Sequence, residues 1–314
     1  MVKLNVINLK KKYVKWELGP LSFSISDKQS LSILGPSGSG KSTLLRTICG
    51  IEEPDNGKIL LDNRDITDIP MEEREIGMVF QESTLFPHMS VRENIKFGLD
   101  NYGFTREEKN DRIEVLKNIF HLERLIDRMP DKLSGGEKQR VAMARAIAVK
   151  PKFLLYDEPL SSIDRRNREV VRGELKAMQY SEGIQFIYVT HDHSEALFMG
   201  DYLAILNNGK IEQIDKADTL YSNPENSFVA WFLGYNILNI NSKTYAIAPE
   251  EIEITEAAGE FSGRIISGSN VQGLWNGYIS INGETIQITS KVDHTDKIGK
   301  KVQITILKKI LVKG

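Results

Sequence analysis

The sequence has little cysteine, no long hydrophobic segment and no marked excess of either charge. Its single cysteine, Cys49, cannot form a disulfide within the chain, which fits a reducing compartment. No segment approaches the roughly 20 apolar residues of a membrane-spanning helix, and the lysine-rich N-terminal stretch is not expected to be a signal peptide. The 41 basic and 43 acidic residues give a net charge of −2, so we expect no general attraction to nucleic acid or anionic lipid. A role at a membrane would therefore require a separate membrane protein.

The 314 residues are enough for two domains, and the hydrophobic pattern changes near residue 233. Up to that point short apolar segments alternate with segments of helical periodicity, which predicts an α/β domain with a mainly parallel, buried sheet. The expected strands include 31–34, 76–80, 153–156 and 186–190, and the expected helices span about 106–129, 141–149 and 167–180. A tight turn is expected at Asn207-Asn208-Gly209.

Residues 234–314 predict a small all-β unit, close to a partly open barrel. Its strands are expected at 263–266, 277–281, 285–289 and 302–307, with a turn at Asn282-Gly283. Small barrels bind oligonucleotides or sugars in some proteins. Nine basic and eight acidic residues, with few aromatics, argue against a nucleic-acid groove here.

One segment matches the phosphate-binding pattern G-x-x-x-x-G-K-S. Its residues are Gly35, Pro36, Ser37, Gly38, Ser39, Gly40, Lys41 and Ser42, and Thr43 follows them. A short apolar run precedes the motif and a helix-like segment follows it, so backbone N–H groups and a helix N-terminus would face the phosphates. Lys41 would reach the β- and γ-phosphates, and Ser42 would offer an oxygen to Mg²⁺. A glycine-rich turn that merely begins a helix is the alternative, which the specificity of the motif disfavours.

Two carboxylates, Asp157 and Glu158, follow the apolar strand 153–156. An unpaired carboxylate beside an apolar strand is costly, so a cation is its natural partner. Asp157 is a candidate ligand of Mg²⁺, and Glu158 is a candidate to polarise an attacking water. The alternative is that these are two acidic residues without a special role at the end of an ordinary strand. The phosphate-binding motif in the same chain disfavours this alternative.

A second helix N-terminus with the character of an anion site is expected after Leu133. Ser134 and Glu137 have the spacing of a capping box, and Gly135 and Gly136 between them let an anion approach the N–H groups. A capped helix after a loop explains the same residues equally well. The presence of the phosphate-binding motif and the carboxylate pair in one chain favours the anion site.

These three segments, in this order, resemble the ATP-binding-cassette ATPases, whose signature is the LSGGE sequence at 133–137. The resemblance covers about residues 1–233 and implies a P-loop core with a helical subdomain at about 82–150. It implies that Gln81 contacts Mg²⁺ or the water, that Asp164 belongs to the D-loop, and that His191 donates to the γ-phosphate. An aromatic residue that stacks on adenine is expected at Tyr13, although the glycine usual after it is missing, and Trp16 is the rival.

The resemblance also implies partners. In the family arrangement the signature segment cannot reach the phosphate loop of its own chain, so two copies would pack head to tail around two ATP molecules. The 82–150 region would dock on integral-membrane permease subunits at the cytoplasmic face of the cell membrane, with an extracytoplasmic solute-binding protein acting indirectly. The barrel at 234–314 would contribute dimer contacts and regulation.

The leading hypothesis is the ATPase subunit of an importer, with no nucleic-acid partner. The C-terminal region is shorter than in sugar importers of the family and, with the 232–238 junction, resembles the oxyanion, iron and polyamine branches. Molybdate, tungstate or sulfate is the expected cargo, with iron, polyamine or sugar as alternatives. A soluble cassette ATPase acting on DNA or ribosomes is the rival function, which the single signature and the lack of sustained heptads disfavour. A non-enzymatic nucleotide-binding module would need Glu158 or His191 replaced, and both are present.

Overall fold

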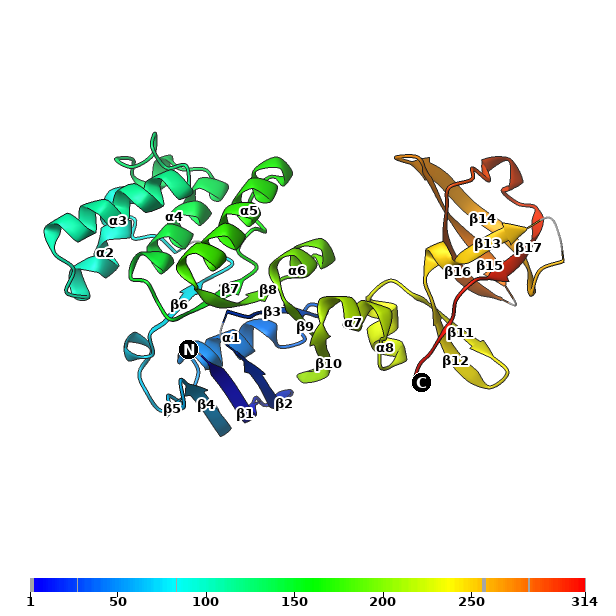
Figure 1. Ribbon diagram of the computed structural model, residues 1–314, viewed down its shortest axis with the longest axis horizontal. Coiled ribbons are helices and arrows are strands. Elements are labelled where there is room, and N and C mark those ends of the chain that lie inside the picture. The colour runs from blue at the N-terminus through cyan, green and yellow to red at the C-terminus, as the bar shows by residue number, and fades with distance from the viewer. Residues whose placement is uncertain (1–2, 27, 83, 256–257, 282, 314) are drawn as a thin grey trace. The chain divides into compact units, whose positions relative to one another are not determined.

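The computed structural model describes residues 3–26, 28–82, 84–255, 258–281 and 283–313. The chain forms two compact units, Met1–Ala217 and Asp218–Gly314 (Figure 1). This division falls after the first residue of α7 (Ala217–Ser222) and before α8 (Ser227–Phe232), whereas the hydrophobic pattern places the boundary at 233/234. The reason is local, because the backbone N–H of Ser227 donates to the carbonyl of Lys313 at 2.8 Å and so ties α8 to the C-terminal strands. In the part of the chain that the structure describes, no helix is long and apolar enough to cross a membrane.

A six-stranded sheet forms the centre of the N-terminal unit, in the order β10-β9-β3-β8-β7-β6. Its strands are β3 (Ser30–Leu34), β6 (Ile76–Val79), β7 (Phe153–Asp157), β8 (Gln185–Val189), β9 (Tyr202–Asn207) and β10 (Lys210–Lys216). All pairs are parallel except β9 with β10. Every residue of β3, β7 and β8 is buried, as in a parallel sheet covered on both faces. The predicted α/β fold with a mainly parallel sheet is confirmed.

Side chains that alternate along β7 and β8 build a separate core on each face of this sheet. On one face Phe153 and Ile187 pack with α1 (Lys41–Cys49) and with a four-stranded antiparallel sheet. On the other face Tyr156 and Phe186 pack with the remaining helices. The four strands are β1 (Leu4–Lys12), β2 (Glu17–Ile25), β4 (Asn56–Leu61) and β5 (Arg64–Asp65). The central sheet thus holds the loops at its strand ends on a rigid, doubly covered support.

Apart from α1, the helices of this unit begin at strong capping residues. They are α2 (Val91–Asn101), α3 (Arg106–Ile119), α4 (Gly135–Ala148), α5 (Arg165–Glu182) and α6 (His193–Met199), with short 3₁₀ turns at Met71–Glu73 and Pro130–Lys132. Complete capping boxes begin α2, α3 and α4, including the Ser134–Glu137 box that the sequence predicts. The prediction of one helix over 106–129 is wrong, because α3 ends near Ile119. His121 there adopts a φ of 50°, and the N–H of Leu122 bonds the carbonyl of Lys117, a Schellman end without the usual glycine.

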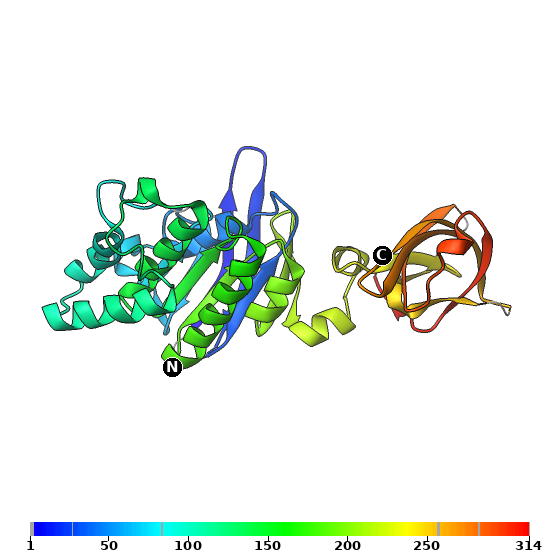
Figure 2. The same ribbon diagram turned by 90° about the horizontal axis from the view of Figure 1, so that it is seen from above.

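The C-terminal unit is all-β after α7 and α8, as predicted, and its strands curve around a common interior (Figure 2). One sheet has the order β13-β17-β14-β15-β16 and the other β11-β12-β18. The strands are β11 (Asn236–Ile240), β12 (Lys243–Ile247), β13 (Ile252–Thr255), β14 (Phe261–Val271), β15 (Leu274–Ile281), β16 (Glu284–Ser290), β17 (Lys301–Ile306) and β18 (Ile310–Leu311), with 3₁₀ turns at Pro249–Glu251 and Thr295–Lys297. The turn predicted at Asn282-Gly283 includes Asn282, which lies outside the described residues.

Candidate functional site

Glycines shape the loop between β3 and α1. Gly40 has a φ of 105°, and a Cβ there would lie 2.6 Å from the Trp16 ring. A Cβ on Gly35 would lie 2.1 Å from the carbonyl oxygen of Leu206. Gly38, with a φ of 78°, has open space where its Cβ would be. The backbone can therefore turn tightly and still leave room for a ligand beside Gly38.

The N-terminus of α1 has the properties of a phosphate site. Among the described residues no side chain caps this helix, and its first turn contains no acidic residue. Its backbone N–H groups and positive dipole end are thus available to an anion. The buried ammonium of Lys41 lies at the same place and donates to the carbonyls of Gly35 and Pro36, at 2.9 Å each. The pKa of Lys41 is lowered, because burial outweighs the opposing effect of the negative charges on Glu158 and Asp157.

The ends of α1 and β7 meet in a hydrogen bond. The hydroxyl of Ser42 donates to Oδ1 of Asp157 at 2.9 Å. Asp157 is only 4% exposed, and burial, followed by the nearby charge of Glu158, raises the pKa of its carboxyl although the Ser42 bond opposes this. A hydroxyl beside a desolvated carboxylate is an oxygen donor set that suits Mg²⁺, whose charge would stabilise the carboxylate. These residues fit a magnesium site.

Glu158 and His191 face each other across the ends of β7 and β8. Oε2 of Glu158 lies 3.0 Å from Nδ1 of His191. The backbone of Glu158 has a φ of 45°, a strained conformation for a residue with a side chain. This conformation is held because the Glu158 N–H bonds the carbonyl of Val189, and its carbonyl accepts from both N–H and Oγ of Ser161. The carboxylate is thereby aimed by its backbone as well as by His191.

These groups share one cavity of about 480 Å³. Its lining consists of Trp16, Ser37, Gly38, Gly40, Lys41, Ser42, Thr43, Gln81, Glu158 and His191. The predicted residues Gly35, Pro36, Ser39 and Asp157 are not in this lining, although Lys41 donates to the carbonyls of Gly35 and Pro36 and Ser42 donates to Asp157. Of the two candidates for adenine stacking, the structure brings Trp16 into the cavity and leaves Tyr13 outside the lining, where its hydroxyl bonds Glu52.

The other predicted residues lie elsewhere on the same unit. Ser134, Gly135 and Gly136 are not among the residues that line the cavity. Gly135 and Gly136 lie instead beside the segment that precedes α5, where a Cβ added at either glycine would lie within about 4 Å of Ser162 or Ile163. Asp164 caps α5 by accepting from the N–H of Asn167 at 3.1 Å. The signature segment is therefore separate from the cavity at the phosphate loop of its own chain.

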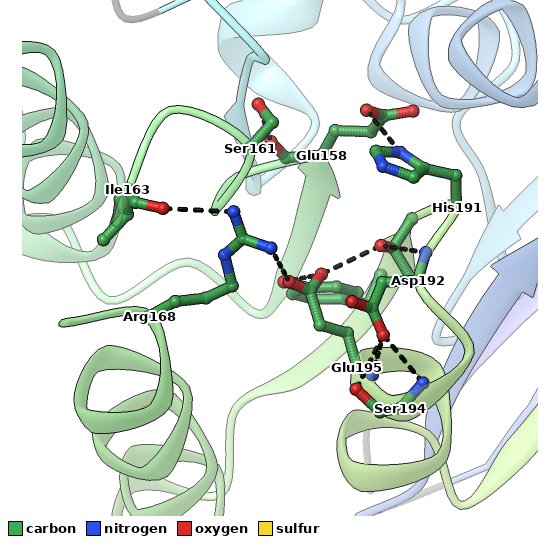
Figure 3. A network of polar contacts seen from close by, with 10 residues as sticks. Glu158, Ser161, Ile163, Arg168, His191, Asp192, Ser194 and Glu195 are labelled. Carbon is green, nitrogen blue, oxygen red and sulfur yellow. Dashed lines mark hydrogen bonds and ion pairs between the residues drawn. The ribbon is translucent and has the colours of Figure 1, made fainter. Parts of the chain in front are cut away.

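Several residues that support the site were not foreseen. Gln139 donates to the carbonyl of Phe80 at 2.9 Å and so fixes the chain next to Gln81. A second group, Arg168, Thr190, Asp192 and Glu195, lines a small cavity together with His191, and Figure 3 shows Arg168, Asp192 and Glu195 to one side of the histidine. The available sequence signal was Glu195, an acidic residue shortly after the apolar strand 186–190. The structure buries this carboxylate, and a buried carboxylate needs polar partners.

A site of this kind belongs to a nucleoside triphosphatase of the phosphate-loop class. The sequence pattern of the family described as ABC transporter matches residues 18–161. The chain is 45% identical over 236 residues to a spermidine/putrescine import ATP-binding protein of Bacillus cereus, spanning 75% of this chain and 72% of that protein. It is 47% identical over 213 residues to the protein of that description from Mannheimia succiniciproducens, spanning 68% and 57%.

The fold is also similar to solved structures. The ATP-binding cassette MJ0796, in a dimeric post-hydrolysis state with ADP and Pi, superposes with a TM-score of 0.63 at 32% identity, over 68% of this chain and 98% of that one. The chain belongs to the ABC transporter family of ATP-binding proteins, and it is an ATPase. The resemblance stated from the motifs is thus confirmed.

Proposed function

We propose that this chain is the ATP-hydrolysing subunit of an importer, with the cavity between Lys41 and His191 as its catalytic site. The observation that carries the proposal is the convergence of Lys41, the Ser42–Asp157 pair and the Glu158–His191 pair on one space. The backbone and side chains of Gly35–Thr43 would bind the triphosphate. Trp16 offers the aromatic surface for adenine in place of Tyr13.

Mg²⁺, held by Ser42 and Gln81 and supported by Asp157, would neutralise charge that develops on the β- and γ-phosphates. Glu158 would orient the attacking water and accept its proton, because it is the acidic residue in the lining of the cavity. His191, with a proton on each ring nitrogen, would donate through Nδ1 to Glu158 and through Nε2 to the γ-phosphate. Lys41 would exchange its loop carbonyl acceptors for phosphate oxygens.

The working form would be a head-to-tail dimer. Ser134, Gly135 and Gly136 lie outside the cavity of their own chain, and the related cassette MJ0796 is described as dimeric. The second copy would therefore place its Ser134–Gly136 segment and Asp164 against the bound triphosphate. Residues 234–314 would add dimer contacts and regulation.

Polyamine is the cargo that we propose. The relatives from Bacillus cereus and Mannheimia succiniciproducens are both named for spermidine and putrescine import, which favours the alternative cargo over molybdate, tungstate or sulfate. Import would require permease subunits, placing this chain at the cytoplasmic face of the membrane, and a solute-binding protein outside.

The proposal is tested by reconstituting the chain with the membrane proteins that co-purify with it, in vesicles loaded with ATP and Mg²⁺. ATP-dependent uptake of labelled spermidine, absent when Glu158→Gln replaces the wild-type chain, is the expected result. Uptake of molybdate without spermidine would refute the cargo but not the ATPase role. Co-purification of nucleic acid without a membrane protein would refute the import role.

A further inference from the structure

A continuous chain of polar contacts links the segment after β7 to the segment after β8 (Figure 3). Arg168, in the first turn of α5, donates through Nη2 to the carbonyl of Ile163 at 3.1 Å. Its Nη1 lies 3.7 Å from Oε1 of Glu195, in the first turn of α6. Ile163 immediately precedes Asp164. One guanidinium therefore contacts both of the segments that border the Glu158–His191 pair.

The contacts continue from Glu195 to the backbone around His191. Oε2 of Glu195 accepts from Oγ1 of Thr190 at 2.8 Å and from the hydroxyl of Tyr188 at 3.2 Å. Oγ1 of Thr190 in turn accepts from the N–H of Asp192 at 3.0 Å. Thr190 and Asp192 flank His191 in the chain, so the carboxylate of Glu195 fixes the backbone on both sides of the histidine.

The His191 side chain depends on this backbone support. It is 68% exposed, and its described polar contact is the one with Glu158. A polar cavity of about 60 Å³ lies between the Glu158–His191 pair and the support. Its lining consists of Glu158, Ser161, Arg168, Thr190, His191, Asp192 and Glu195. Movement of Arg168 or Glu195 would therefore reach His191 through the hydrogen bonds of Thr190 and Asp192 on either side of it.

The buried carboxylate of Glu195 depends on the positive charge of Arg168. The side chain of Glu195 is 6% exposed and that of Arg168 is 31% exposed. A buried carboxylate that loses its cation is left uncompensated. Glu195 would then take other partners or draw in water, and its bond to Thr190 would change.

We propose that Arg168 is a positioning residue of the ATPase site, which holds His191 against Glu158 by joining Ile163 to Glu195. The inference rests on the roles proposed above for Glu158 and His191. It also gives the Ser161–Asp164 segment a route to the site, because displacement of that segment by a second copy would reach His191 through Arg168. No contact between Arg168 and the nucleotide is needed.

The test separates turnover from binding in the full-length chain. In Arg168→Gln we expect kcat of ATP hydrolysis to fall about 10- to 100-fold through misplacement of the His191–Glu158 pair. KM and ATP affinity should stay close to wild type, because Lys41 and Ser42 keep their contacts. Arg168→Lys keeps the charge but not the two-pronged geometry, so it should recover part of the lost kcat. The ¹⁵N resonance of His191 Nδ1 should shift in Arg168→Gln, reporting a weakened bond to Glu158.

Arg172→Gln is the matched control. Arg172 lies one turn further along α5, with its guanidinium 4.5 Å from the centre of the Phe198 ring, so the variant removes the same charge from the same helix. Its kcat and His191 resonance should match wild type. The double variant Arg168→Gln/Glu195→Gln removes both charges and thereby protects folding. It should lose no more kcat than Arg168→Gln alone, because both changes break one contact.

Wild-type kcat in Arg168→Gln and in the double variant would overturn the inference, as would a fall shared equally by Arg172→Gln. The inference would also be overturned if kcat/KM fell in Arg168→Gln only through a rise in KM, with kcat unchanged. Glu158→Gln, measured in parallel, separates this outcome from failure of the proposed site. If Glu158→Gln is inactive while Arg168→Gln is unaffected, only the positioning role is wrong, and if Glu158→Gln hydrolyses ATP normally, the proposed site itself is wrong.

Discussion

The hydroxyl of Ser42 and the carboxylate of Asp157, 115 residues apart in the chain, meet in a hydrogen bond of 2.9 Å. Ser42 is at the start of α1 and Asp157 is the last residue of β7, so the bond joins the phosphate loop to the central sheet. The carboxylate is buried, and burial raises its pKa. A negative charge on this buried carboxylate costs stability, and a bound cation would offset that cost.

Asp157→Asn should stabilise the protein in the absence of nucleotide and abolish most Mg²⁺-dependent hydrolysis. The amide can still accept from Ser42 but carries no charge, so we expect a gain of about 1 kcal/mol near neutral pH. The pKa of Asp157 is higher in the folded protein than in the unfolded protein. The stability cost of its charge is therefore absent at a pH below the unfolded-state pKa, and it develops as the pH rises to the folded-state pKa. The gain measured by urea unfolding should therefore shrink on acidification.

The exposed Asp111→Asn is the control for this change, and it should alter neither stability nor its pH dependence. Equal stability of Asp157→Asn and wild type at neutral pH would argue against a burial cost at Asp157. Full Mg²⁺-dependent activity in Asp157→Asn would argue against its role as support of the metal.

Lys41→Ala should weaken ATP binding by about 100-fold, since a buried, charge-assisted contact to phosphate contributes roughly 3 kcal/mol. Titration calorimetry with ATP measures the change directly. Lys58→Ala is the control, because Lys58 is an exposed lysine that pairs with Asp65 on the same unit. Normal ATP affinity in Lys41→Ala would show that the phosphate-loop interpretation is wrong.

Ser134→Arg should leave ATP binding to the monomer intact and block the ATP-dependent dimer. Ser134 also caps α4, so the change costs about 1 kcal/mol of stability for that reason alone. Ser90→Arg removes the equivalent cap of α2 and should dimerise normally. Light scattering with ATP distinguishes the two variants. Loss of binding by monomeric Ser134→Arg would contradict a role in the partner's site.

Arg74→Met should destabilise the N-terminal unit by about 3 kcal/mol, because it leaves several buried carbonyls without a donor. The Arg74 guanidinium donates to the carbonyls of Thr47, Ile48, Thr67 and Ile69, at 2.6 to 3.1 Å. It thereby closes the C-terminus of α1. Arg64→Met, at an exposed arginine on β5, should change stability by less than about 0.5 kcal/mol. Equal unfolding midpoints for the two variants would refute this role.

Contiguous features of the site were predictable from the sequence. The Gly35–Ser42 loop, the Asp157-Glu158 pair and the Ser134–Glu137 box are each defined within eight residues, and the strands that carry the first two are apolar runs. Features made by distant partners were not predictable. Arg74 bonds backbone carbonyls, which have no sequence signature, and Arg168 meets Glu195 only because β8 returns beside β7.

The choice between Tyr13 and Trp16 shows the same limit. Both are aromatic and three residues apart, and the family pattern favours Tyr13. Trp16 lines the cavity because its ring lies close to Gly40. This contact exists only once the loop has folded. In the C-terminal unit the β11–β12 hairpin was missed because its turn is Asn241-Ser242, with positive φ at both residues and no glycine.

In the function proposed for this chain, Glu158 activates the water that hydrolyses ATP. Glu158→Gln keeps the shape of the side chain but cannot accept a proton, so phosphate release at saturating ATP and Mg²⁺ should fall by at least about 100-fold. ATP affinity should be unchanged, and the ATP-bound dimer should accumulate in light scattering. Phosphate release within a few-fold of wild type, with ATP bound normally, would contradict this role of Glu158.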